Sequence, residues 1–248
     1  MNTIFSPMVQ GLHASAPSHS LLTKAVASAI DTWTMIERIT SNADLEEGMA
    51  ALVALHPDWQ PIVARTGLPP LRLREGGFPG LAAIIVSQQL SVASARAVWN
   101  RFTGVFVPLT PARVLAATDD DMRLSGLSRP KQRTLLALAT ALVQGRFAFE
   151  ALEHASPEEV HARMTAISGI GPWTADVYLL FCLGHRDGFA AGDLAIQEAA
   201  RHAFGLTARP KPIELQAMAE AWRPWRGVAA RLLWADYALL KRREGINA

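Results

Sequence analysis

The residues best suited to a chemical role are Gly169, Ile170 and Gly171, which lie between two helical stretches and are followed at once by Pro172. Two glycines around an aliphatic residue allow a tight turn with a bare backbone, and Ile170 then faces inward. Amide groups at the start of the helix that Pro172 opens can bind a phosphate oxygen. The pattern predicts a helix-hairpin-helix that grips a nucleic-acid backbone without reading its sequence. An ordinary helical corner with a glycine C-cap is the alternative.

Asp193, which follows Gly192 and opens the next predicted helix, is the candidate catalytic group. It has two interpretations: a helix N-cap, or a carboxylate that the helix dipole keeps ionised beside the hairpin. The spacing does not separate these interpretations. Asp187 is the only rival carboxylate in the preceding loop, whereas Asp176 is expected to be a surface or supporting residue.

The elements that must position these residues are helices, because apolar side chains recur every three or four positions along most of the chain. The pattern predicts an all-α fold of about ten short helices. The expected helices cover residues 31–55 (broken near 41–42), a long helix over 81–102 whose apolar stripe is interrupted at 87–91, and 111–117, 130–143, 157–166, 173–183, 194–204, 213–221 and 225–240. Residues 71–73 are the best candidate for a strand, and residues 1–30 are expected to form a flexible lead-in.

Composition excludes several classes of protein. A single cysteine in 248 residues rules out a disulfide scaffold, a four-thiolate zinc site and a cysteine-ligated iron–sulfur cluster. No apolar run approaches the roughly 18 residues that a membrane span needs, and the first 20 residues lack signal-peptide features. We therefore expect a soluble protein of a reducing compartment. His185 and His202 are expected to be exposed or capping, and Cys182 to fill space in the core.

Charge gives a weaker indication. The formal net charge is +2, and only four of the 24 basic residues are lysines. Arginine suits phosphate recognition, although a GC-rich genome produces the same bias. From residue 201 onward the sequence has nine basic and four acidic residues, and this excess of positive charge is compatible with an anionic partner.

Five segments, in order, resemble the helix-hairpin-helix DNA glycosylases, and most of all the DNA-3-methyladenine glycosylase II family. They are Ile85–Ser91, Gly126–Ser128 with Lys131, the run ISGIGPWTA at 167–175, the run GDLAI at 192–196, and Ala221–Arg226 with Leu233 and Trp234. The resemblance covers residues 45–240. It implies one glycosylase domain over residues 31–248, built as two helical lobes with the active-site cleft between them and the hairpin at about 165–183.

Residue by residue, the resemblance assigns Asp193 as the catalytic aspartate and Trp173 and Trp234 as aromatic residues around the extrahelical base. Some members carry a tyrosine four residues after the first tryptophan, where this chain has Val177. Tyr178 follows one position later, about 100° further round a helix. We assign Tyr178 to the pocket as well; the alternative is that Tyr178 belongs to the core and that the pocket has a different shape.

The resemblance also implies the DNA contacts. A wedge segment that enters the duplex matches Gln88, Gln89 and Leu90. The phosphate clamp matches Gly169, Gly171 and Thr174. Backbone carbonyls for a monovalent cation, Na⁺ or K⁺, match Thr165, Ile167 and Ile170.

The implied activity is that of a monofunctional DNA N-glycosylase that flips and excises alkylated purines, of the 3-methyladenine and 7-methylguanine type, from double-stranded DNA. A purine alkylated on a ring nitrogen is a cationic leaving group, so one carboxylate can suffice, unlike the pair of most sugar hydrolases. No cofactor is expected for the chemistry. We expect a monomer without membrane association, located in the bacterial cytoplasm with the nucleoid or in a eukaryotic nucleus.

Two alternatives remain open from the sequence. A bifunctional glycosylase/lyase of the same superfamily needs a lysine two residues after the second glycine of the hairpin to form a Schiff base, and Trp173 stands there. A non-catalytic helix-hairpin-helix module would bind DNA but would not need Asp193.

Overall fold

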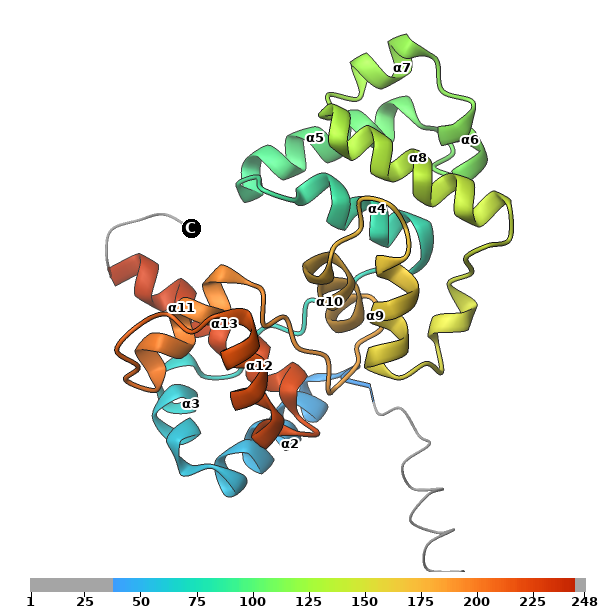
Figure 1. Cartoon of the computed structure of the whole chain (residues 1–248). Coiled ribbons are helices and arrows are strands. Elements are labelled where there is room, and N and C mark those ends of the chain that lie inside the picture. Colours follow the sequence, from blue (N-terminus) through green and yellow to red (C-terminus); the bar gives the residue numbers. More distant parts are fainter. Residues whose placement is uncertain (1–37, 244–248) are drawn as a thin grey trace, which may run out of the picture. The chain divides into compact units, whose positions relative to one another are not determined.

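Helices form almost all of the regular structure in the computed structural model, which describes residues 38–243 (Figure 1). The helices are α2 (Asn42–Leu55), α3 (Gln60–Thr66), α4 (Gly77–Ser87), α5 (Val92–Val105), α6 (Pro111–Leu115), α7 (Asp119–Leu124), α8 (Arg129–Val143), α9 (Pro157–Thr165), α10 (Pro172–Phe181), α11 (Leu194–Ala203), α12 (Pro212–Ala219) and α13 (Arg226–Arg243), with 3₁₀ turns at Pro57–Trp59, Glu150–Leu152 and Glu220–Trp222. The prediction of an all-α fold is confirmed. The strand expected at 71–73 is wrong, since these residues adopt neither helix nor strand.

The expected lead-in, residues 1–30, lies outside the described residues. Within the described part of the chain, no helix is long and apolar enough to cross a bilayer.

Local sequence explains where several helices begin. The Ser41 side chain accepts a hydrogen bond from the Asp44 amide, and Ser156 does the same for Glu159, so both complete capping boxes. Pro157 and Pro172 occupy the first turns of α9 and α10, where a missing amide hydrogen is not needed. These starts fix the direction of the two helices on either side of the hairpin.

The helices associate in two groups, both within one compact unit. In one, α4 packs against α5, α8 and α10, while α9 lies along α10 and α6 along α8. In the other, α2, α3 and α11 pack on α13, and α12 packs on α11. The labels of Figure 1 allow both groups to be followed. The hairpin belongs to the first group and Asp193 to the second, so the site depends on contacts between the groups.

The long helix expected over 81–102 is two helices. Gln88 leaves the helical conformation with ψ of 134°, and Gln89 has a φ of +56°. The Ser91 side chain then caps α5 by accepting a hydrogen bond from the Ser94 amide. The polar residues that interrupt the apolar stripe therefore form an exposed connection between α4 and α5. Helices α3 and α7 were not expected, because both are short.

A buried ion-pair network fixes the loop that leads to Asp193. Asp187 accepts two hydrogen bonds of 2.9 Å from Arg226 and one of 2.6 Å from Arg223. The side chain of Arg226 is only 3% exposed. His185, expected to be exposed or capping, is buried instead, and its Nδ1 accepts a hydrogen bond from the Asp187 amide. Asp187 therefore holds the loop and is not a free rival to Asp193.

We predict that Asp187→Ala lowers the free energy of unfolding by about 3 kcal/mol, because it removes two of the hydrogen bonds of the buried Arg226 guanidinium and leaves that charge only Glu220 as a partner. Chemical denaturation with a circular dichroism readout measures this. Glu47→Ala, at an exposed position of α2, is the control and should change stability by less than about 0.5 kcal/mol. An equally small effect of Asp187→Ala would contradict a structural role for the network.

Candidate active site

Asp193 is the N-cap of α11, and its carboxylate faces the start of that helix. Its Oδ1 accepts hydrogen bonds from the amides of Ala195 at 2.9 Å and Ile196 at 3.1 Å. The positive end of the helix dipole stabilises a negative charge at this position. The capping interpretation is therefore correct, and the helix that it caps creates the electrostatic setting that a catalytic carboxylate needs.

Two tryptophans complete the surroundings of Asp193. Trp173, in the first turn of α10, donates a hydrogen bond from Nε1 to Oδ2 at 2.7 Å. Trp234, in α13, donates one from Nε1 to Oδ1 at 3.1 Å. The carboxylate thus receives four N–H donors from three helices, while Asp193 itself remains partly exposed. These four hydrogen bonds fix the orientation of the carboxylate.

Phe181 is a neighbour of this site that the sequence did not single out. The centres of its ring and of the Trp234 ring lie 5.3 Å apart, and the Arg231 guanidinium lies 5.0 Å from the Phe181 ring centre. Arg231 in turn donates hydrogen bonds to the carbonyls of Leu180 and Gly227. Phe181 follows Val177 by four residues on α10, which is the helical spacing that could have indicated it.

The assignment of Tyr178 to the base pocket is wrong. Tyr178 is 1% exposed, its hydroxyl accepts a hydrogen bond of 2.8 Å from the Gly77 amide, and its ring lies 5.6 Å from that of Phe149. Burial raises the pKa of the Tyr178 hydroxyl. The offset of about 100° from position 177 turns the ring into the core between α10 and the start of α4.

The two hairpin glycines have different reasons for being glycine. Gly169 has a φ of +88°, and a Cβ there would lie 2.0 Å from the Thr134 hydroxyl oxygen. A Cβ on Gly171 would meet nothing within 4 Å. Ile170 is 4% exposed and fills the space under the turn, as predicted. Gly169 is thus needed by the fold, whereas Gly171 leaves an open approach to the amides that follow it.

The proposed role of Thr174 in the phosphate clamp is not compatible with its position. Its side chain is buried, its amide donates to the Gly171 carbonyl at 3.0 Å, and its hydroxyl accepts a hydrogen bond of 2.7 Å from Gln88 Nε2. Thr174 therefore connects the hairpin to the wedge segment (Gln88–Leu90), and its burial keeps it from contact with a phosphate.

The wedge segment is exposed at its tip, as a segment that enters a duplex must be. Gln89 is exposed, Leu90 is 39% exposed, and Val92 just after them is 79% exposed. Val92 was not singled out from the sequence, although its place next to the wedge segment was visible there. An apolar side chain so exposed suits contact with unstacked bases.

The carbonyl oxygens of Thr165, Ile167 and Ile170 are compatible with a monovalent cation. The Ile167 carbonyl accepts the Ile170 amide at 3.0 Å and keeps a second lone pair. Among the described residues, no hydrogen bond is donated to the carbonyls of Thr165 or Ile170 outside the helices. Carbonyl oxygens that keep a lone pair without a hydrogen bond are the kind of ligand that hard cations prefer.

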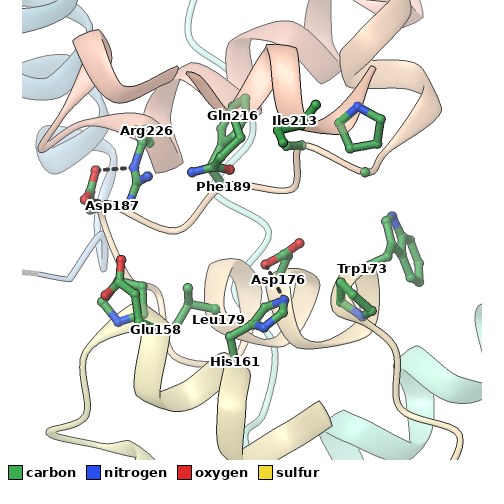
Figure 2. A pocket seen from close by; sticks show the side chains of 15 residues that line it. Glu158, His161, Trp173, Asp176, Leu179, Asp187, Phe189, Ile213, Gln216 and Arg226 are labelled. Carbon is green, nitrogen blue, oxygen red and sulfur yellow. Dashed lines mark hydrogen bonds and ion pairs between the residues drawn. The ribbon is translucent and has the colours of Figure 1, made fainter. Parts of the chain in front are cut away.

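A cavity of about 720 Å³ lies beside this site and has Trp173 and Gly192 in its wall, but not Asp193 (Figure 2). Asp176 lines it from α10, and His161 Nε2 lies 3.9 Å from the Asp176 carboxylate. The Asp176 side chain is 15% exposed, and burial raises its pKa to about 7. Asp176 is thus a half-buried cavity residue with a perturbed proton affinity, and its carboxylate does not face the solvent freely.

This raised pKa of Asp176 makes the free energy of unfolding depend on pH in a definite direction. Because folding favours the protonated carboxyl, the contribution of Asp176 to stability is present below about pH 4 and is lost as pH rises through about 7. Asp176→Asn removes this loss. We predict that its free energy of unfolding relative to wild type rises by on the order of 2 kcal/mol between pH 5 and pH 8. Denaturant titrations at the two pH values measure it, and a difference independent of pH would contradict the burial argument.

Comparisons with known proteins point to one family. The family model described as HhH-GPD superfamily base excision DNA repair protein matches residues 82–226. The chain is 33% identical to DNA-3-methyladenine glycosylase 1 of Schizosaccharomyces pombe over 75% of this chain and 87% of that protein. It is 24% identical to an alkylbase DNA glycosidase-like protein of the same yeast over 79% of this chain and 95% of that one.

Solved structures show the same fold. The S. pombe 3-methyladenine DNA glycosylase in complex with abasic DNA superposes with a TM-score of 0.69 at 31% identity, over 76% of this chain and 95% of that one. A DNA-3-methyladenine glycosidase from Bacillus halodurans gives a TM-score of 0.71 at 27% identity, over 83% of this chain and 94% of that one. The hairpin, the helix N-terminus that holds Asp193 and these matches identify the chain as a member of the helix-hairpin-helix superfamily of base excision DNA repair proteins.

Proposed function

We propose that the chain is a monofunctional DNA N-glycosylase that flips alkylated purines out of duplex DNA and hydrolyses their glycosidic bonds, leaving abasic sites. The observation that carries this proposal is the Asp193 carboxylate, which four N–H groups hold in place at a helix N-terminus. The alkylated substrate class rests on the relatives named as 3-methyladenine glycosylases.

The chemistry needs one well-placed negative charge. As the bond from the sugar C1′ to the ring nitrogen breaks, its electron pair neutralises the cationic base and positive charge develops on the sugar. The fixed Asp193 carboxylate stabilises that charge. Water then adds to C1′ and gives up a proton to the surrounding solvent, and Asp193 orients this water. Trp173 and Trp234 hold the carboxylate, and their rings face a flipped cationic base, where each contributes about 0.5–2 kcal/mol.

DNA is gripped by the hairpin and opened by the wedge segment. The open space at Gly171 lets a phosphate approach the amides of Gly171 and Trp173, since Pro172 has no N–H and the amides of Thr174 and Ala175 bond the Gly171 carbonyl. A sodium or potassium ion on the carbonyls of Thr165, Ile167 and Ile170 would add a positive charge beside that phosphate. Gln89 and Leu90 fill the gap that the flipped nucleotide leaves, which offsets part of the few kcal/mol that flipping costs.

The two alternatives are less well supported. A lyase requires an amine at the position of Trp173, and this side chain instead donates a hydrogen bond to Asp193. A pure binding module has no use for a carboxylate that four donors orient. We further propose that the enzyme needs no cofactor for its chemistry and acts as a monomer on chromosomal DNA, in the bacterial cytoplasm or a eukaryotic nucleus.

We predict that Asp193→Asn abolishes base release while the protein stays folded, because Asn keeps a capping oxygen and loses the charge. The expected loss in the single-turnover rate is at least about 100-fold. Release of 3-methyladenine and 7-methylguanine from alkylated duplex DNA, separated by chromatography, measures it. Near wild-type release by Asp193→Asn would rule out the catalytic assignment.

The same reactions distinguish the lyase alternative. A monofunctional enzyme leaves an intact strand with an abasic site, so borohydride should trap no covalent protein–DNA adduct. A trapped adduct would place the chain in the lyase class.

Two further substitutions separate the hydrogen bonds of the tryptophans from their stacking. Trp173→Phe and Trp234→Phe keep an aromatic ring and remove the N–H donor to Asp193. Each should lower the rate of base release by about tenfold, the effect of losing a hydrogen bond to a charged group. Trp222→Phe, in the aromatic cluster with Trp59 and Phe204, is the control and should leave the rate within about twofold. Unchanged rates for both site variants would mean that the indole N–H groups do not orient Asp193.

A further inference from the structure

Lys131, in the first turn of α8, reaches across to the end of α4. Its Nζ donates one hydrogen bond to the carbonyl of Val86 and one to the carbonyl of Gln88, each at 2.8 Å. Carbonyls at the end of a helix lack partners within the helix, and a positive charge there interacts favourably with the helix dipole. The ammonium group therefore binds α4 at the point where the wedge segment begins.

The bond to Gln88 also sets the conformation of the next residue. The Gln88 carbonyl belongs to the peptide unit that joins Gln88 to Gln89, so holding its oxygen holds the Gln89 amide. Gln89 has a φ of +56°, a conformation that side chains other than glycine rarely adopt. A residue in such a conformation persists only where its surroundings impose it.

Few other contacts hold the wedge segment. The Leu90 amide donates a long hydrogen bond of 3.3 Å to the Ser87 carbonyl, and the Gln88 side chain binds Thr174. The tip residues Gln89 and Leu90 are exposed. Burial lowers the pKa of Lys131, in agreement with an amine that is partly shielded from water.

We propose that Lys131 is a positioning residue for base flipping: its ammonium group holds the wedge segment in the shape in which Gln89 and Leu90 enter the duplex. The inference rests on the proposed function, because it assigns Lys131 to the flipping step of that reaction. Lys131 acts through the backbone of the wedge segment and does not touch the reacting atoms.

The neighbouring residue on α8 provides a matched control. Gln132 also uses its side chain to bind two backbone carbonyls, those of Met122 at 3.3 Å and Leu127 at 2.8 Å. These carbonyls lie in and after α7 and are not part of the wedge segment. Gln132→Leu therefore removes the same kind of contact from the same helix without touching the wedge segment.

The test compares two duplexes that differ only in the cost of flipping. In one, a single alkylated purine is paired with its normal partner; in the other, it lies opposite an abasic site, where flipping costs less. Lys131→Met should lower the single-turnover rate on the paired duplex by about tenfold and on the unpaired duplex by less than about twofold. Leu90→Ala should show the same pattern, and Lys131→Arg should restore most of the rate on the paired duplex.

Gln132→Leu should lower the thermal midpoint at least as much as Lys131→Met and leave the ratio of the two rates unchanged. If Lys131→Met slows both duplexes equally, or only lowers the thermal midpoint, Lys131 is structural and the inference is wrong. An unchanged ratio for both Lys131→Met and Leu90→Ala would also overturn it.

A second readout does not depend on hydrolysis. Fluorescence of 2-aminopurine placed next to the lesion rises when the lesion leaves the stack, and this can be followed in the Asp193→Asn protein. Adding Lys131→Met should remove the rise while the protein still binds the duplex. A rise without base release by wild type would contradict the proposed function and leave the role of Lys131 intact, whereas an equal rise with and without Lys131→Met would overturn that role.

Discussion

The site depends on a single carboxylate that three helices hold in common. Asp193 caps α11, accepts a hydrogen bond from Trp173 on α10 and accepts another from Trp234 on α13. Since α10 belongs to one group of helices and α11 and α13 to the other, the two groups must be correctly packed for the carboxylate to be fully hydrogen-bonded. A polar group that receives all its partners only in the folded arrangement favours that arrangement over others.

The loop before Asp193 carries this constraint further. Asp187 is bonded to Arg226 at the start of α13, and the Gly227 amide donates to the Arg186 carbonyl at 2.7 Å. The chain from the end of α10 to Asp193 is therefore attached to the same helix that carries Trp234. The fold thus sets the position of Asp193 from both sides, through the residues before it and through the helix that it caps.

Much of this could be predicted from the sequence. Helical periodicity, the glycines of the hairpin and Asp193 before a helix are local signals, and they led to the correct fold class and to Asp193 as the candidate catalytic residue. What could not be predicted depends on contacts between distant residues. The hydrogen bond of Trp234 to Asp193 spans 41 residues. The error on Tyr178 arose because one position on a helix changes which side of it a side chain faces. Thr174 was misassigned because its partner, Gln88, lies in another segment of the chain.

The bond between Gln88 and Thr174 bears on how the protein searches DNA. Under the proposed function, it links the hairpin, which grips the backbone, to the wedge segment, which probes the stack. A search along undamaged DNA that keeps this bond requires no rearrangement of the hairpin against the wedge segment. The free-energy cost of inspecting each base pair is then the cost of breaking the stacking and pairing of the DNA. Bases whose stacking has already been weakened by damage therefore leave the stack most easily, before the pocket selects among them.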